Sequence, residues 1–202
     1  DLAKLALPNT TITSAQMVAA GAFTPPAAPA GRSEENASAT RGGGPAGRGA
    51  AAGRGAAGGR GAGAGAANQI YTSLPAFCRV AATLEPSSDS DIKIEVWLPA
   101  SGWNGKFQGV GNGGWAGTIV YNALAAAVAG GYATASTDTG HVGNTAAFAL
   151  GHPEKLVDMG YRAIHEMTVQ GKAITDAYYG GNPKLSFFNG CSLGGRQAIT
   201  EA

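Results

Sequence analysis

A serine between two glycines, in Gly190-Cys191-Ser192-Leu193-Gly194, is the part of this sequence that most directly suggests chemistry. It follows a short apolar run at 184–188 that suits a buried strand, and the residues after it favour a helix. A serine on a sharp strand-to-helix turn needs small neighbours, because a Cβ on either side would collide with the adjoining strand and helix. Such a turn would raise the Ser192 hydroxyl at the carboxyl edge of a sheet, where the Leu193 amide could face an oxyanion. The pattern predicts acyl transfer; the alternative is a glycine-rich turn with an incidental serine.

A second glycine-rich stretch, Gly111 to Gly117, could supply the other half of such a site. Acyl transfer needs a second oxyanion donor, which a loop after an earlier strand can provide. Glycines expose bare amides, so Gly113 or Gly114 is the expected donor. The alternatives are glycines that only shape a tight turn, or a phosphate cradle in a nucleotide-binding module. The segment that begins at Gly109 matches the dinucleotide pattern only loosely, and no clear helix follows it at once.

The sequence offers no clear catalytic base. Its three histidines all precede Ser192, whereas in sheets of this kind the acid and then the histidine follow the nucleophile. A triad in the order Asp138, His141, Ser192 is an alternative, because triads occur in several chain orders. Asp138 more often binds loop amides, however, and His141 more often hydrogen-bonds locally or lines a pocket mouth. His152 is expected at the surface and His165 at a helix packing border, and no two histidines have the spacing of metal ligands, so no metal site is predicted.

The elements that must position these residues alternate along the chain. Strands are expected at 11–19, 77–84, 92–98, 106–110, 132–137 and 184–188, and helices at 122–129, 155–179 and 196–202. The second and third strands read as a hairpin. In the long helix apolar residues recur at three- and four-residue steps, and Gly171 marks a close contact with the sheet. The order predicts an α/β fold: a mostly parallel sheet with right-handed crossovers, preceded by an antiparallel hairpin.

Residues 25–68 are mostly alanine, glycine, proline and arginine. They would bury too little surface to offset the entropy of ordering, so they are predicted to be a disordered insertion between residues 1–24 and 69–202 of one domain. From Arg48 to Arg60 an arginine recurs every six residues, and an Arg-Gly tract can bind RNA. No aromatic residue alternates with the arginines to stack on bases. A solvated loop is preferred; the alternative is an Arg-Gly-rich nucleic-acid-binding protein with a noncatalytic scaffold.

The overall composition excludes two further classes of partner. The 14 basic and 13 acidic side chains give a formal net charge of +1, so no global field favours nucleic acid or an anionic membrane. No apolar run approaches the roughly 20 residues that span a bilayer.

The two cysteines, Cys78 and Cys191, could pair with each other, pair with cysteines outside this chain, or stay reduced.

A series of short motifs runs through the chain in a specific order. They are Leu-Pro-Asn-Thr-Thr-Ile-Thr-Ser-Ala from Leu7, Phe77-Cys78-Arg79-Val80, Glu95-Val96-Trp97-Leu98-Pro99, Trp103-Asn104-Gly105-Lys106-Phe107, Gly111-Asn112-Gly113-Gly114, Thr137-Asp138-Thr139-Gly140-His141 and Gly190-Cys191-Ser192-Leu193-Gly194-Gly195-Arg196. This series resembles the tannase and feruloyl esterase family, which includes the bacterial mono(2-hydroxyethyl) terephthalate hydrolases. The resemblance implies an α/β-hydrolase, usually secreted or periplasmic, that cleaves esters of gallic, ferulic or related aromatic acids. It also implies that Ser192 is the nucleophile and that Cys191 is bonded to a cysteine beside the catalytic histidine.

The chain departs from that family by ending early. The family's acid, its base, the cysteine beside that base, and a lid with most substrate contacts and a calcium site would lie beyond Ala202. The partner of Cys78 would lie before Asp1. We therefore expect an amino-terminal fragment of a serine carboxylic-ester hydrolase for a small aromatic ester, with no cofactor in this chain and no affinity for nucleic acid or membrane. Alone it should be nearly inactive.

Overall fold

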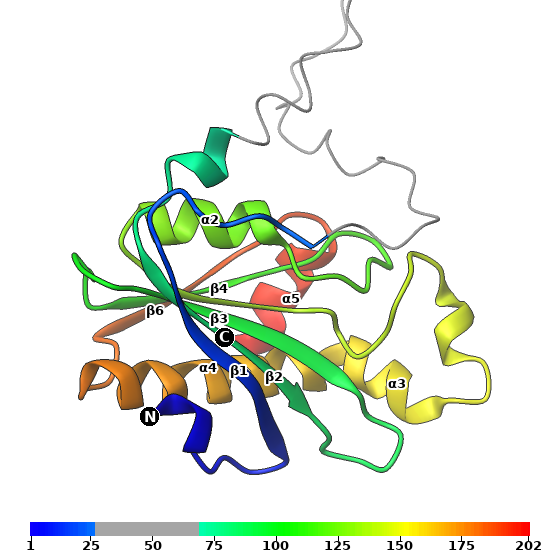
Figure 1. The fold of residues 1–202 in the computed structure, drawn as a ribbon. Helices are drawn as coiled ribbons and strands as arrows, with labels where there is room; N and C mark the ends of the chain where they lie inside the picture. Colours follow the sequence, from blue (N-terminus) through cyan, green and yellow to red (C-terminus); the bar gives the residue numbers. More distant parts are fainter. Residues whose placement is uncertain (27–68) are drawn as a thin grey trace, which may run out of the picture.

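Residues 1–26 and 69–202 are described in a computed structural model of the chain (Figure 1). The strands are β1 (Thr10–Val18), β2 (Phe77–Leu84), β3 (Ile92–Pro99), β4 (Lys106–Val110), β5 (Ala133–Thr137) and β6 (Leu185–Asn189). The longer helices are α2 (Tyr121–Ala129), α4 (Ala163–Tyr179) and α5 (Leu193–Glu201), and the short helical segments are η1 (Leu2–Lys4), η3 (Ala146–Ala149), α3 (Pro153–Val157) and η4 (Asp158–Arg162). Apart from its first two residues, the insertion predicted at 25–68 lies outside the described residues, so its disorder and the RNA alternative stay predictions.

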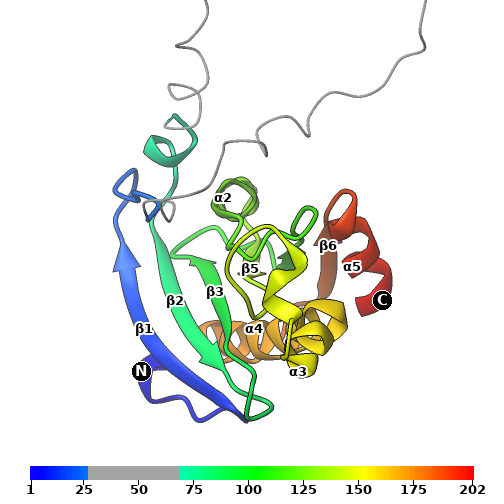
Figure 2. The ribbon, with the colours of Figure 1, turned by 90° about the vertical axis from the view of Figure 1, so that its right-hand side faces the viewer.

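The six strands of the described residues form one mixed sheet in the order β1-β2-β3-β5-β4-β6 (Figure 2). β4 pairs in parallel with β5 and β6, and the pairs β1–β2, β2–β3 and β3–β5 are antiparallel. The predicted hairpin and crossovers are therefore confirmed, and each strand lies within one residue of its predicted bounds. The described sheet is mixed rather than mostly parallel, because β1 adds to the outer edge of the hairpin and β3 runs against β5.

Helices cover both faces of this sheet (Figure 1). On one face Ile164, Met167 and other residues of α4 pack on β2, β3 and β5. On the opposite face Leu124 and Val128 of α2 pack with Trp97 of β3. Since β3 is covered on both sides, nearly all of its residues are buried. This three-layer arrangement is the usual solution for a sheet joined by helical crossovers.

The helix predicted at 155–179 is one helical segment made of α3, η4 and α4, which ends at Gly180 with φ 72°. The glycine expected to mark a close contact does so. A Cβ on Gly171 would lie 2.9 Å from the ring of Phe107 in β4. The prediction of this contact is therefore confirmed.

The five residues of η4 form a π-helical turn inside that segment. The buried carboxylate of Asp158 accepts a hydrogen bond from Arg162 Nε at 2.6 Å. A π turn interrupts the regular hydrogen-bond ladder of a helix. Here the carbonyl groups of Met159 and Gly160 accept hydrogen bonds from the guanidinium of Arg196 in α5, at 3.2 and 2.7 Å. The π turn thus anchors the helix that follows Ser192.

An ion pair between the partly buried Arg79 and the buried Glu95 fastens the hairpin to α2. Arg79 Nε donates to Glu95 Oε2 at 2.8 Å, and the same carboxylate accepts from Trp97 Nε1 and from the Tyr121 hydroxyl, each at 2.9 Å. Glu95 is only 5% exposed. Removing one partner from such a pair typically costs about 3–5 kcal/mol, because the other charge is left buried. The network therefore stabilises the antiparallel half of the molecule.

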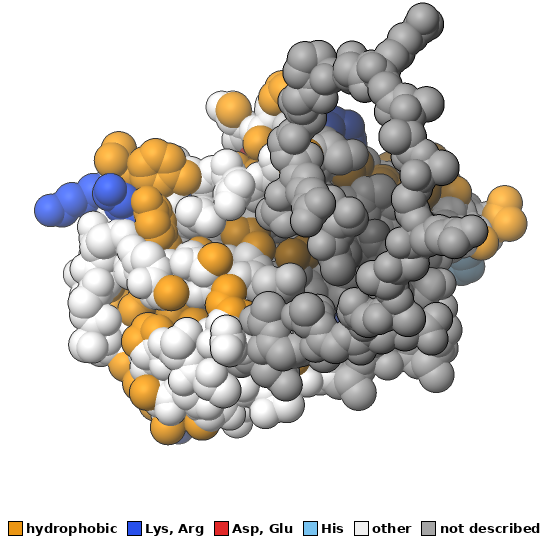
Figure 3. Space-filling model, turned by 90° about the horizontal axis from the view of Figure 1, so that it is seen from above, with side chains coloured by type: hydrophobic (Ala, Val, Ile, Leu, Met, Phe, Trp, Pro, Cys, Tyr) orange, Lys and Arg blue, Asp and Glu red, His pale blue; other side chains and the backbone are white. Residues whose placement is uncertain are grey.

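Seen from above, the visible described surface carries few charged side chains (Figure 3). Every helix within residues 1–26 and 69–202 is too short or too polar to cross a membrane.

Candidate active site

Ser192 occupies the sharp turn between β6 and α5, with φ 57° and ψ −118°. A positive φ is uncommon for a residue with a side chain. A Cβ on Gly190 would lie 2.6 Å from the backbone of Gly194, and a Cβ on Gly194 would lie 3.0 Å from the carbonyl oxygen of Asn112. The predicted need for glycine on both sides is therefore confirmed. The helix begins at Leu193, three residues earlier than predicted, and the Ser192 side chain is exposed.

The glycine-rich loop after β4 lies directly against this turn. The N–H of Gly111 donates to the carbonyl of Asn189, the last residue of β6, at 2.9 Å. A Cβ on Gly111 would lie 2.6 Å from Cα of Gly194. The carboxyl ends of β4 and β6 thus bring the two glycine-rich stretches into backbone contact, as the oxyanion interpretation requires.

Three backbone N–H groups near this contact are available to a ligand. Leu193 is the first residue of α5, and the first N–H groups of a helix have no partner within it. Gly113 and Gly114 lie in the facing loop, and Gly114 adopts φ 54° with open space where a Cβ would stand. Within the described parts of the chain, none of the three amides donates a hydrogen bond. The arrangement can therefore receive a negatively charged oxygen.

Two residues that the sequence did not single out connect the loop to the helix. The backbone N–H of Asn112 donates to Gln197 Oε1 at 3.0 Å, and Gln197 Nε2 donates to Asn112 Oδ1 at 3.3 Å. Both side chains are buried. The only local signal is weak: Asn112 stands between glycines, and Gln197 is a polar residue on a short helix that packs on the sheet.

The alternative triad does not form, because His141 and Asp138 are bound elsewhere. His141 Nε2 donates to the carbonyl of Trp115 at 2.8 Å, and Nδ1 lies 3.1 Å from the hydroxyl of Thr139. Asp138 Oδ1 accepts from the backbone N–H of Gly140 and of Lys93, each at 2.9 Å. Asp138 was expected to bind backbone amides of a loop and His141 to hydrogen-bond locally, and both expectations are confirmed.

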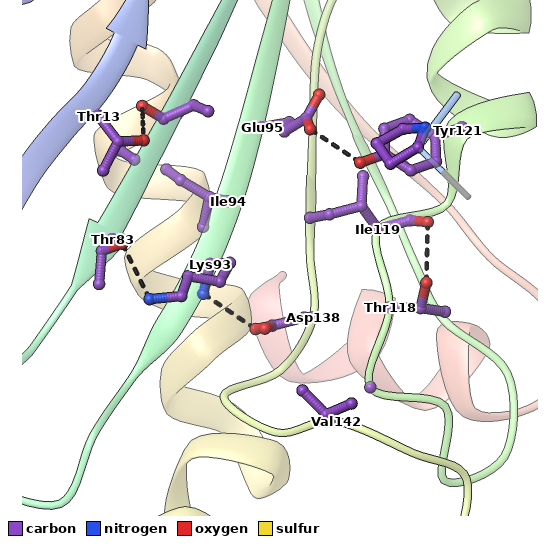
Figure 4. Close-up of a pocket in the computed structure, with 14 residues that line it drawn as sticks. Thr13, Thr83, Lys93, Ile94, Glu95, Thr118, Ile119, Tyr121, Asp138 and Val142 are labelled. Atoms are coloured by element: carbon purple, nitrogen blue, oxygen red, sulfur yellow. Dashed lines mark hydrogen bonds between the residues drawn. The ribbon is translucent and has the colours of Figure 1, made fainter. Parts of the chain in front are cut away.

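Burial raises the pKa of Asp138 to about 7, although hydrogen bonds from the Gly140 and Lys93 amides favour its charged form. The side chain faces a hollow of about 480 Å³ between β2, β3 and the loop before α2 (Figure 4). It also lines a second hollow of about 430 Å³ together with His141 and Phe148. Ser192 lines neither hollow.

The remaining histidines do not reach Ser192. His152 Nδ1 lies 2.9 Å from a carboxylate oxygen of Asp89, and His165 Nδ1 lies 3.5 Å from one of Glu201. Both histidine side chains are more than half exposed, as expected for His152. Among the described residues no group of histidine, cysteine and acidic side chains could hold a metal ion.

The two cysteines are not bonded to each other. Cys78 is buried in β2, where burial raises the pKa of its thiol, and Cys191 is exposed beside Ser192. A pairing between the two is thereby ruled out in this structure. The partners predicted outside the chain stay predictions.

Comparison with known proteins gives consistent matches. The profile of the family described as "Tannase and feruloyl esterase" matches residues 78–202. An uncharacterized esterase of Xanthomonas campestris pv. campestris is 40% identical over 205 residues, covering 100% of this chain and 28% of the relative. A protein of Aspergillus flavus named "Probable feruloyl esterase B-2" is 45% identical over 135 residues, 67% of this chain and 25% of the relative. The crystal structure of feruloyl esterase B from Aspergillus oryzae matches with a TM-score of 0.72 at 30% identity, over 96% of this chain and 31% of that one.

These matches confirm the predicted α/β-hydrolase fold and give no support to a nucleic-acid-binding protein. The chain spans about a quarter of the length of the curated relatives it matches. Because the profile matches more than half of the chain, from the buried hairpin through the turn at Ser192, this chain belongs to the tannase and feruloyl esterase family.

Proposed function

We propose that this chain carries the nucleophile and the oxyanion hole of a serine carboxylic-ester hydrolase that acts on esters of aromatic acids. The observation that supports it best is the turn at Ser192, which exposes a hydroxyl beside amides with no partner in the described residues. Membership of the family supports ester substrates. The catalytic acid and base are proposed to come from outside these 202 residues, since none of the three histidines of the chain is bonded to Ser192.

In the proposed reaction, Ser192 Oγ attacks the carbonyl carbon of the ester and passes its proton to the external base. The carbonyl oxygen becomes an oxyanion that accepts hydrogen bonds from the Leu193 amide and from Gly113 or Gly114. Collapse of this intermediate breaks the bond to the alcohol, which leaves with that proton, and an acyl-serine remains. Water then attacks the acyl-serine, releases the carboxylic acid and restores Ser192.

An aromatic acyl group suits the surroundings of the proposed oxyanion hole. Trp115 follows Gly114 directly and is 43% exposed. Its ring lies 6.2 Å from that of Phe148, which stacks on His141 at 3.8 Å. Aromatic pairs contribute about 0.5–1.5 kcal/mol beyond the area they bury. The Trp115 and Phe148 rings, inclined at 55° to each other, are proposed to pack against the aromatic part of the acyl group.

We also propose a secreted or periplasmic location, in which Cys191 forms a disulfide with a cysteine outside this chain. Disulfides persist in oxidising compartments, and the exposed thiol of Cys191 is free to pair. Mass spectrometry of unreduced peptides from the natively expressed full-length protein tests this. A peptide with free Cys191 would contradict it.

The ester-hydrolase proposal is tested by labelling the full-length protein with a fluorophosphonate and sequencing the modified peptide. We expect the label on Ser192 and its absence from Ser192→Ala. Methyl ferulate should be cleaved with a higher kcat/KM than methyl acetate if the acyl group is recognised as aromatic. A label on another serine, or ester cleavage that Ser192→Ala retains in full, would refute the proposal.

A further inference from the structure

Two buried amide side chains join the loop after β4 to the helix that follows Ser192. Gln197 is 1% exposed and Asn112 is 3% exposed. The Asn112 backbone donates to Gln197, and Gln197 donates back to the Asn112 side chain, at 3.0 and 3.3 Å. The two hydrogen bonds close a ring between residues 85 positions apart. Buried and fully enclosed, such a pair is stronger than the same bonds in water.

Asn112 is also bound on its other side. Its Nδ2 donates to the carbonyl of Thr118 at 2.8 Å and to the carbonyl of Thr137, the last residue of β5, at 2.9 Å. Its Oδ1 is the acceptor for Gln197. Since each polar atom of the side chain has a partner, Asn112 has one orientation, and it fixes the loop to β5 and to α5 together.

The proposed oxyanion donors lie on the two elements that this pair connects. Gly113 follows Asn112 directly, and Leu193 precedes Gln197 by about one helical turn. The backbone contact between Gly111 and Gly194 limits how closely the loop and helix approach. The Asn112–Gln197 pair limits how far they separate. Oxyanion donors must be held to about half an ångström, because they act on charge that appears only in the transition state.

We propose that Gln197 and Asn112 are positioning residues that set the distance between the two halves of the oxyanion hole. The inference rests on the proposed function and deepens it. Gln197 is buried behind the turn and acts on the reaction through Asn112, not by contact with the substrate. Its removal should therefore lower the rate of acyl transfer more than the binding of substrate.

The test compares two buried glutamines in the full-length protein. Gln197→Met keeps the side-chain shape and removes both hydrogen bonds to Asn112. Gln170→Met makes the same change at a side chain that is 2% exposed but bonds only within α4, to Glu166 at 3.4 Å. We expect kcat for p-nitrophenyl acetate to fall about 10- to 100-fold in Gln197→Met, with KM within about threefold, and both constants to stay within about twofold in Gln170→Met.

Hydrogen–deuterium exchange gives a readout that does not depend on activity. The hydrogen-bonded amides of the loop, those of Asn112, Ala116 and Gly117, should exchange at least about tenfold faster in Gln197→Met than in the wild type, and at the wild-type rate in Gln170→Met. Gln197→Leu, which removes both hydrogen bonds with a shorter apolar side chain, should match Gln197→Met in both measurements. This second variant also serves if Gln197→Met does not fold.

The outcomes separate the two proposals. Unchanged kcat in a folded Gln197→Met or Gln197→Leu, or unchanged exchange in the loop, would overturn the positioning role while Ser192 remained the nucleophile. A fall in kcat that Gln170→Met shares would also overturn it, because a general loss of stability would then explain both. Full activity in Ser192→Ala would remove the ester-hydrolase proposal, and loop exchange would then decide alone whether Gln197 holds the loop.

Discussion

Two clusters of polar groups stand at the same edge of the sheet, one after β5 and one after β4 and β6. The first contains Asp138 and His141, the residue types expected of a catalytic site, and nearly all of their hydrogen-bonding atoms have partners. The second contains one serine and several bare amides, and these have no partners within the described residues. Judged by residue type, the first cluster would be chosen as the reaction site. Judged by hydrogen-bonding groups that are still open, the second would be chosen. Under the proposed function, the reaction site is the cluster whose groups are open to a ligand, not the cluster with the familiar catalytic residue types.

Backbone strain does not separate the two clusters. Thr139 has φ 60°, close to the 57° of Ser192, and a positive φ is more unusual for a β-branched residue. Thr139, however, is 1% exposed, and its hydroxyl donates to the Asp138 carbonyl at 2.6 Å. Thr139 belongs to a segment in which the carbonyl oxygen of Gly143 accepts a hydrogen bond from the N–H of Gly117, at 2.8 Å. The cluster after β5 therefore supports the loop that the second cluster uses.

The strongest test of the difference between the two clusters removes one side chain from each. Ser192→Ala should lower kcat/KM for methyl ferulate about 10⁴-fold or more, because the nucleophile is lost. His141→Asn should lower it by no more than about tenfold, since His141 supports the loop through the Trp115 carbonyl and the Phe148 ring and has no contact with Ser192. Steady-state kinetics of the full-length protein measures both. Equal losses would mean that the cluster after β5 takes part in the chemistry.

The second largest effect concerns stability and the buried Asp138. Its carboxyl has a pKa of about 7 when folded and an ordinary value near 3.8. Between these values the folded state binds more protons than the unfolded state, so stability falls as the pH rises through this window. Below about pH 4 both states are protonated, and above about pH 7 both are ionised. The loss should therefore be complete by about pH 8 and amount to about 2–4 kcal/mol.

Asp138→Asn isolates this contribution, because its Oδ1 can still accept from the Gly140 and Lys93 amides while the group no longer titrates. Urea unfolding at pH 5 and pH 8 measures the change in stability between the two conditions. The wild type should lose about 2–4 kcal/mol more than the variant on going to pH 8. The same pH dependence in both proteins would show that Asp138 does not titrate in this range.

Glycine substitutions test how closely the backbone is packed at the turn that carries Ser192. Gly190→Ala should destabilise the protein by about 2–3 kcal/mol, because the new Cβ would meet the Gly194 backbone at 2.6 Å, where no flexible side chain can yield. Gly160→Ala, in η4 with open space around its Cβ position, should be neutral or stabilising by up to about 1 kcal/mol. Denaturant midpoints of the two variants give the difference. A neutral Gly190→Ala would contradict the turn geometry.

Much of the fold and part of the site follow from local sequence patterns. Alternating apolar residues give the strands within one residue, and the glycines around Ser192 and in the loop from Gly111 give the two backbone halves of the site. The start of α5 was placed too late, because Gly194 and Gly195 have low helix propensity. They lie in the first turn of the helix nevertheless, where a Cβ on Gly194 would stand only 3.0 Å from the carbonyl oxygen of Asn112.

The features that the sequence did not show depend on contacts between distant residues. Asn112 and Gln197 are 85 positions apart, and neither has a pattern that marks the other as its partner. The π turn in η4 and the burial of Asp138 depend likewise on neighbours in the folded chain. Periodicity reports which face of an element is apolar; it does not report which polar groups meet inside.

The smallest predicted effect concerns the attachment of α5 to the π turn. Arg196→Ala should cost about 1 kcal/mol, because two hydrogen bonds to the carbonyls of Met159 and Gly160 are lost at a partly exposed position. Glu201→Gln, which removes the 3.5 Å contact with His165 between the same two helices, should cost only a few tenths. Urea unfolding in 0.1 M and 1 M NaCl measures both contributions.

Salt distinguishes the two contacts further. The acceptors of Arg196 are neutral carbonyl groups, so its contribution should change little between the two salt concentrations. Any charge contribution from the partly exposed pair of Glu201 and His165 should instead be screened. A salt-sensitive loss in Arg196→Ala would mean that its charge acts on a carboxylate rather than on the carbonyl groups of the π turn. The anchor of the nucleophile helix would then be electrostatic, and the turn at Ser192 would loosen in high salt.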